Sequence, residues 1–189
     1  MSQLIDSYLL QLDECLDPTR IIQSAADDPH LFQYGAILDH PKVGNSNALV
    51  RTLAFGSYRD LSVGVSDAVR LKMKKLDILS CVVDSGLLGV RIQTLCGRVD
   101  ATKVLLFQIL LEMTTIDRLM DFRIDERNDV LNVSKVHLMR DVHPDEWPGL
   151  RDRWEALAER VREMQPADLS RFARIEAMLG KAAQISGSV

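Results

Sequence analysis

Apolar residues recur at intervals of three and four through most of the chain, and this periodicity predicts a mainly α-helical protein. Prolines at 18, 29 and 41 separate a first helix from two shorter helical segments, IIQSAA and LFQYGAIL. Residues 1–65 are therefore expected to form a short array of stacked helical hairpins. Five residues share the inner face of the first helix: Ile5, Tyr8, Leu9, Leu12 and Leu16.

Longer helices are expected between residues 45 and 119. One lies within 45–61, starts with good N-cap residues and ends near Gly56. Another starts at Ser66 or Asp67 and turns Val69, Leu76, Leu79 and Val83 toward the core. The segment LLGVRIQTLC follows and breaks at Gly97, after which Asp100 is the expected N-cap of a long helix over residues 101–119.

Residues 122–133, FRIDERNDVLNV, have the alternation of a β-hairpin, with apolar residues on one face and polar residues on the other. Three helices followed by a two-stranded ribbon is the order of a winged helix, so residues 66–140 are expected to form one. A lone hairpin is marginal in water, so its free edge is expected to bind a partner. The interface residues proposed there are Phe122, Arg123, Ile124, Leu131, Asn132 and Val133.

Beyond Pro144 the apolar residues again recur at intervals of four and three. A seam of this kind after a complete domain favours a segment, residues 144–185, that packs against helices of other subunits. A helix folded back on the chain's own core fits the pattern equally well. The seam consists of Leu150, Trp154, Leu157, Val161, Leu169, Phe172, Ile175 and Leu179.

Composition narrows the class of protein. The 189 residues include 23 basic and 27 acidic ones, so the formal net charge of -4 does not favour polyanions. Three cysteines without C-x-x-C spacing, and a start that lacks a signal-peptide pattern, indicate a reduced intracellular protein. No apolar run approaches the roughly 20 residues of a membrane span, so no membrane partner is expected.

The sequence contains no recognisable catalytic, cofactor-binding or metal-binding motif. The histidines at 30, 40, 137 and 143 do not have zinc-ligand spacing, and the G-x-S-x-G, P-loop and G-x-G-x-x-G patterns do not occur. HPDEW at 143–147 gathers a histidine, two acids and a tryptophan, and a helix start explains it more simply. No enzyme activity, cofactor or metal ion is therefore expected.

Nucleic-acid binding is the rival function, because many winged helices read DNA with their third helix. Between Asp100 and Asp117 that helix has one basic residue, Lys103, and its VLLF and ILL runs indicate burial. The basic residues of the preceding helix are interpreted as its solvated face, so no nucleic-acid partner is expected. They are Arg70, Lys72, Lys74 and Lys75.

Three stretches carry a family resemblance: YGAILDHPKV at 34–43, LVRTLAFGSYRDL at 49–61 and IDERNDVLNV at 124–133. With KMKKLDILSCV at 72–82 and Trp154, they make residues 30–165 resemble the PCI domains shared by the proteasome lid, the COP signalosome and translation initiation factor three. The match is closest to the subunit-seven group of the signalosome.

That resemblance implies a non-catalytic scaffold of the cytoplasm and nucleus. PCI subunits join wing to wing, and their terminal helices gather in a common bundle. The signalosome removes the ubiquitin-like modifier Nedd from cullins and so regulates cullin-RING ubiquitin ligases, and its zinc centre resides in another subunit. The alternatives are a PCI subunit of initiation factor three or of the proteasome lid, and a winged-helix nucleic-acid-binding protein.

Overall fold

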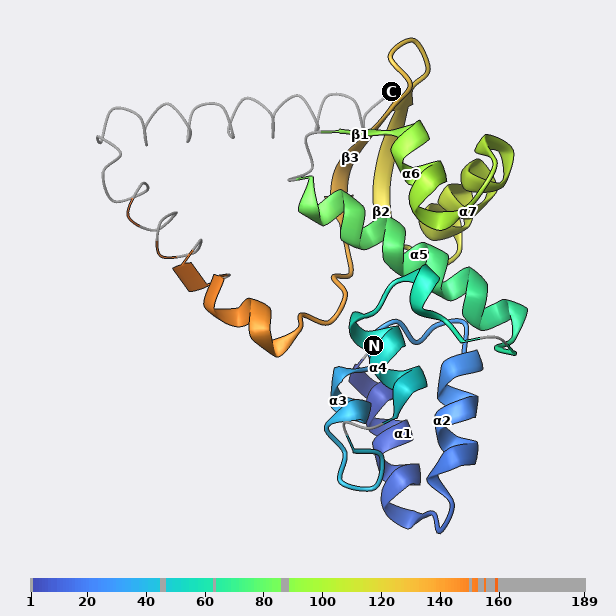
Figure 1. Cartoon of the computed structure of the whole chain (residues 1–189), viewed down its shortest axis with the longest axis vertical. Coiled ribbons are helices and arrows are strands. Elements are labelled where there is room, and N and C mark those ends of the chain that lie inside the picture. The colour runs from blue at the N-terminus through green and yellow to red at the C-terminus, as the bar shows by residue number, and fades with distance from the viewer. Residues whose placement is uncertain are drawn as a thin grey trace, which may run out of the picture. The chain divides into compact units, whose positions relative to one another are not determined.

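The computed structural model describes residues 2–44, 47–62, 64–85, 89–149, 151, 152, 155 and 159. These residues are mainly helical, with a small three-stranded antiparallel sheet (Figure 1), and the prediction of a mainly α-helical protein is confirmed. The chain divides into two compact units, Met1–His143 and Pro144–Val189. The finer division into 1–65, 66–140 and 144–185 stays a prediction.

The central helix of the first unit is α5. It contacts α2 on one side and α6 and α7 on the other, so it joins the N-terminal helices to the sheet region (Figure 1). The elements in chain order are α1 (Ser2–Glu14), α2 (Pro18–Asp27), α3 (Gly35–Leu38), α4 (Ala48–Phe55), η1 (Tyr58–Asp60), α5 (Asp67–Asp84), β1 (Val90–Arg91), α6 (Ile92–Val99), α7 (Lys103–Thr115), β2 (Met120–Asp125) and β3 (Val130–Val136). In the second unit, η2 is Pro144–Glu146.

Capping residues fix where most helices begin. The side chains of Asn47 and Ser66 accept hydrogen bonds from Val50 N and Val69 N, which confirms the predicted starts of α4 and α5. At the end of α1 the prediction is wrong, because Leu16 lies outside the helix and is fully exposed. The cause is Pro18, which disfavours helical backbone at Asp17, and Asp17 instead caps α2.

Three details of the predicted helices differ in the structure. Helix α6 continues through Gly97 to Val99, and Asp100 ends it in the left-handed region at φ 46°. Thr102, and not Asp100, is the N-cap of α7. Both residues are good caps by type, and the turn between them decides which one is used. On α5 the inward residue is Val82, whereas Val83 is 37% exposed.

The sheet contains a strand that the hydrophobic pattern did not reveal. The order is β1-β3-β2, so β3 is central and pairs with β1 through Val90↔Leu131 and Arg91↔Val130. Gly89 precedes β1 at φ +98°, and a side chain there would collide with Val130 and Asn132. The predicted hairpin is confirmed, with its strands extended to Met120–Asp125 and Val130–Val136.

One hydrophobic core runs through the first unit. It includes Leu12 from α1, Leu53 from α4, Leu76 from α5, Leu106 from α7 and Leu131 from β3, all with 0% exposure. Because the N-terminal helices and the sheet share this core, they are expected to unfold together.

Candidate interaction surface and the buried charges behind it

The hairpin divides its six proposed interface residues between two faces. Leu131 and Val133 are buried in this chain's own core, and Phe122 and Ile124 pack against that core while partly exposed. The polar pair, Arg123↔Asn132, is exposed on the other face. In this conformation Leu131 and Val133 contact this chain rather than a partner. The partner role of the hairpin stays a prediction.

The open edge of the hairpin belongs to β2. Strand β3 is covered by β1 at its start, whereas β2 has no outer neighbour among the strands that the structure describes. Its register shifts at Asp121/Phe122, an irregularity of the kind that limits uncontrolled edge pairing. The β2 edge is therefore available for strand addition, and so is the β1 side of β3 beyond Leu131, which pairs with none of the described strands.

Polar contacts hold the tip of the hairpin. The Asp125 carboxylate accepts hydrogen bonds from the backbone N–H of Arg127 and Asn128 and from the Asn128 side chain, and these bonds lower the pKa of Asp125. Lys103 Nζ donates to Asp129 at 2.5 Å and ties the tip to the start of α7. The hairpin is thus oriented by α7 as well as by its own ladder.

Helix α7 is only half buried, so the expectation that its apolar runs are covered is wrong. Leu106, Ile109, Leu110 and Met113 face the core. The described residues leave the opposite side of the helix open to solvent. The exposed apolar residues, here called the α7 outer face, are Val104 at 70%, Leu105 at 38%, Leu111 at 61% and, just beyond the helix, Ile116 at 66%.

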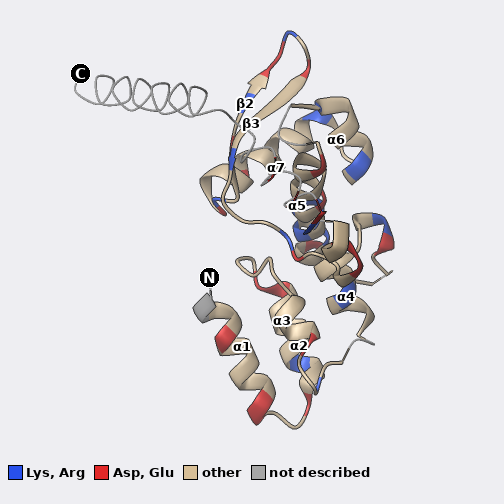
Figure 2. Cartoon of the chain, turned by 90° about the vertical axis from the view of Figure 1, so that its left-hand side faces the viewer, with Lys and Arg blue, Asp and Glu red and all other residues tan. Residues whose placement is uncertain are grey.

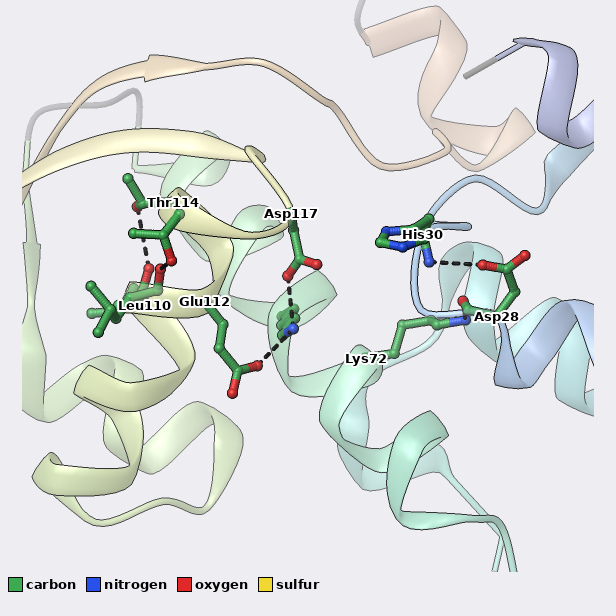
Figure 3. Close-up of polar contacts among 10 residues, drawn as sticks. Asp28, His30, Lys72, Leu110, Glu112, Thr114 and Asp117 are labelled. Atoms are coloured by element: carbon green, nitrogen blue, oxygen red, sulfur yellow. Dashed lines mark hydrogen bonds and ion pairs between the residues drawn. The ribbon is translucent and has the colours of Figure 1, made fainter.

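Lys72 does not lie on a solvated face of α5, as the sequence suggested. It is 3% exposed, and its Nζ donates to the carbonyl oxygens of Ala26 and Asp28 and to Tyr34 Oη. Figure 3 shows Lys72 reaching toward Asp28. The Lys72 ammonium group at the C-terminal end of α2 donates to the last carbonyl oxygens of that helix and interacts favourably with the helix dipole. Burial in turn raises the pKa of Tyr34.

Lys75 is the second buried lysine of α5, with 7% exposure. Its Nζ lies 2.9 Å from Glu112 Oε2 and 2.7 Å from Asp117 Oδ2, so α5 is joined to α7 and to the turn after it (Figure 3). Because it pairs with two carboxylates, its charge is compensated where water is excluded.

The segment after the hairpin returns to the N-terminal helices with two adjacent charges. The Arg140 guanidinium donates to the carbonyl oxygens of Ala54, Thr52 and Leu53 at 2.8 to 3.0 Å, at the end of α4. The Asp141 carboxylate accepts from the backbone N–H of Tyr34 and Gly35, at the start of α3. Each charge has the sign that complements its helix end. Burial lowers the pKa of Arg140 and raises that of Asp141.

Lys72→Met is expected to remove a pH dependence of stability. Burial lowers the pKa of Lys72 from 10.5 to about 8, so between these values the unfolded chain binds more protons than the folded chain. Stability contributed through this group therefore rises with pH from about 8 to about 10.5. Urea unfolding at pH 8 and pH 10 should show the free energy of the wild type rising relative to that of the variant. Equal pH dependences would contradict this prediction.

The proposed seam lies outside the described residues. This applies to Leu150, Trp154, Leu157, Val161, Leu169, Phe172, Ile175 and Leu179, and their bundle role stays a prediction. The short helix η2 starts at Pro144 within HPDEW, as the helix-start interpretation expected.

The described part of the chain contains no group of three or more potential metal ligands. His40 and His137 each contact a single carboxylate, of Asp13 at 3.1 Å and Asp121 at 2.9 Å. No helix within the same residues has both the length and the apolarity to cross a bilayer.

Comparison with known proteins found no family model and no curated protein that matches this chain.

Proposed function

We propose that this chain is a non-catalytic assembly subunit built on a winged helix. The observation that carries the proposal is the order α5-β1-α6-α7-β2-β3 with the sheet order β1-β3-β2, since three helices, a short strand and a hairpin are the parts of that module. The open edge of β2 gives it a surface for joining a partner.

The α7 outer face supports a protein partner over a nucleic acid. A reading helix needs arginine, lysine, asparagine or glutamine toward the phosphates and base edges. Here Gln108 is exposed, but the exposed positions around it include Val104, Leu111 and Ile116, and Lys103 is already paired with Asp129. Figure 2 shows basic and acidic residues interspersed along the chain rather than separated into a basic surface.

The finer assignment is a PCI subunit, and within that family a subunit of the COP signalosome resembling subunit seven. It is supported by the quoted stretches at 34–43, 49–61 and 124–133 and by the direct packing of the N-terminal helices on α5. In such a complex the chain would hold its neighbours in place while another subunit removes Nedd from cullins. A PCI subunit of initiation factor three or of the proteasome lid is the second candidate.

Duplex DNA is expected to bind weakly and only at low salt. The chain carries a net charge of -4 and presents an uncharged α7 outer face, so few phosphates can be neutralised. Fluorescence anisotropy with a labelled random duplex, followed as salt is raised, measures this. Sequence-specific binding that persists at moderate salt would favour the nucleic-acid function instead.

Arg123→Glu is expected to reduce recovery of partner subunits about tenfold without changing the melting temperature. Arg123 is exposed on β2, so its charge can be reversed without disturbing the core. Arg51→Glu on α4 is the matched control, because it reverses an exposed arginine away from the hairpin. The two variants are compared by the amount of partner subunits that co-purifies from native cells and by the melting temperature from circular dichroism. Equal recovery from both variants would refute the role of the β2 edge.

A further inference from the structure

A surface pocket of about 390 Å³ lies among η1, α5 and α6, away from the hairpin tip. Two guanidinium groups line it, Arg59 from η1 and Arg98 from the last turn of α6. The pocket is also lined by two hydroxyl-bearing residues, Ser57 and Thr94, and by Asp77 and Cys81. The pocket therefore combines cationic donors with one carboxylate.

Neither arginine makes a hydrogen bond or ion pair with an acidic side chain of the described residues, although the charge of Arg98 acts on the carboxylates of Asp60 and Asp77. Arg59 Nη2 donates to the carbonyl oxygen of Gly97 at 3.0 Å, which fixes the guanidinium beside α6 and leaves its other N–H groups available. Arg98 makes no hydrogen bond or ion pair with the described residues. Guanidinium groups match the oxygens of carboxylates and phosphates through paired donors. The pocket thus has the donors for an oxyanion.

Asp77 limits which oxyanion fits. Its Oδ2 accepts from Tyr58 N at 2.8 Å, and Oδ1 lies 3.8 Å from Arg140 Nη1. The residue is 1% exposed, and Oδ1 has no hydrogen-bond partner within the described residues. An unprotonated oxyanion such as sulfate would bring a second acceptor toward this oxygen, whereas a protonated phosphate can donate to it. Asp77 lines the pocket, so a ligand bound there lies beside this carboxylate.

We propose that this pocket binds a hydrogenphosphate group, with its unprotonated oxygens accepting from Arg59 and Arg98 and its P–OH directed toward the Asp77 carboxylate. The volume of about 390 Å³ leaves room for a small organic body on the phosphate, since one water occupies about 30 Å³. Burial raises the pKa of the Cys81 thiol, so little of it is thiolate at neutral pH. The site is independent of the assembly role.

Isothermal titration of the full chain at neutral pH tests the proposal, with inorganic phosphate and sulfate at matched ionic strength. We expect phosphate to bind saturably and sulfate at least tenfold more weakly. Arg98→Gln should weaken phosphate binding about tenfold, since a hydrogen bond to a charged group is lost. Arg127→Gln, an exposed arginine in the hairpin turn, is the matched control and should leave binding unchanged. O-phosphoserine distinguishes the sources: tighter binding than phosphate assigns an organic phosphate, and weaker binding assigns free phosphate.

Asp77→Asn adds a second test of selectivity. The amide keeps an oxygen for Tyr58 N and replaces the repelling carboxylate, so sulfate should bind within about threefold of phosphate. A circular dichroism melt checks that this variant folds. If it does not fold, the change in phosphate binding of Arg98→Gln is the test of the proposal. Equal binding of phosphate and sulfate to the wild type, or binding unaffected by Arg98→Gln, would overturn the proposal.

Discussion

Replacing Arg140 with methionine is expected to lower the free energy of unfolding by about 3 to 5 kcal/mol, the range for breaking a buried charge pair. The guanidinium binds three carbonyl oxygens at the end of α4 and lies 3.8 Å from the Asp77 carboxylate, and its side chain is 10% exposed. Methionine fills a similar volume but donates no hydrogen bond, so the Leu53 and Ala54 carbonyls lose this donor, whereas Thr52 O keeps the bond from Gly56 N. The loss would extend to the packing of the N-terminal helices.

Urea unfolding followed by circular dichroism measures this change. Arg127→Met is the control, because it makes the same substitution at an exposed arginine, where surface changes stay within about 0.5 kcal/mol. A free energy for Arg140→Met within about 1 kcal/mol of the wild type would show that this return segment does not hold α4.

Leu131→Ala is expected to lower the free energy of unfolding by about 2 to 5 kcal/mol, because it removes a fully buried side chain from the central strand and leaves a cavity. Leu111→Ala makes the same chemical change on the α7 outer face, where the side chain is 61% exposed, and should cost less than about 1 kcal/mol. Denaturant midpoints of the two isolated variants compare them. Similar losses, or a stable Leu131→Ala, would mean that Leu131 faces outward and that a partner is needed to cover it.

Local patterns in the sequence were enough to predict most helices and the hairpin. The caps Asn47 and Ser66 and the alternation around residues 122–133 each act within a few residues of the element that they define. Strand β1 could not be found in this way, because two residues carry no periodicity and its pairing with β3 is 40 residues distant.

The buried charges were missed for the same physical reason. Lys72 and Lys75 look like surface residues by type, and only the folded chain brings the end of α2 and the acids near α7 to them. Arg140 and Asp141 bind groups 86 to 107 residues earlier. The exposed side of α7 could not be predicted from its apolar runs, because such runs do not show which face of the helix is covered by the rest of the fold.

The most direct test of the assembly role is affinity purification of the tagged full chain from its native cells, with the co-purifying proteins identified by mass spectrometry. The proposal predicts stoichiometric recovery of the other signalosome subunits, including the one that carries the zinc centre. Recovery of initiation factor three or proteasome lid subunits would keep the scaffold role and change the complex. Recovery of nucleic acid with no PCI subunit would contradict the proposal.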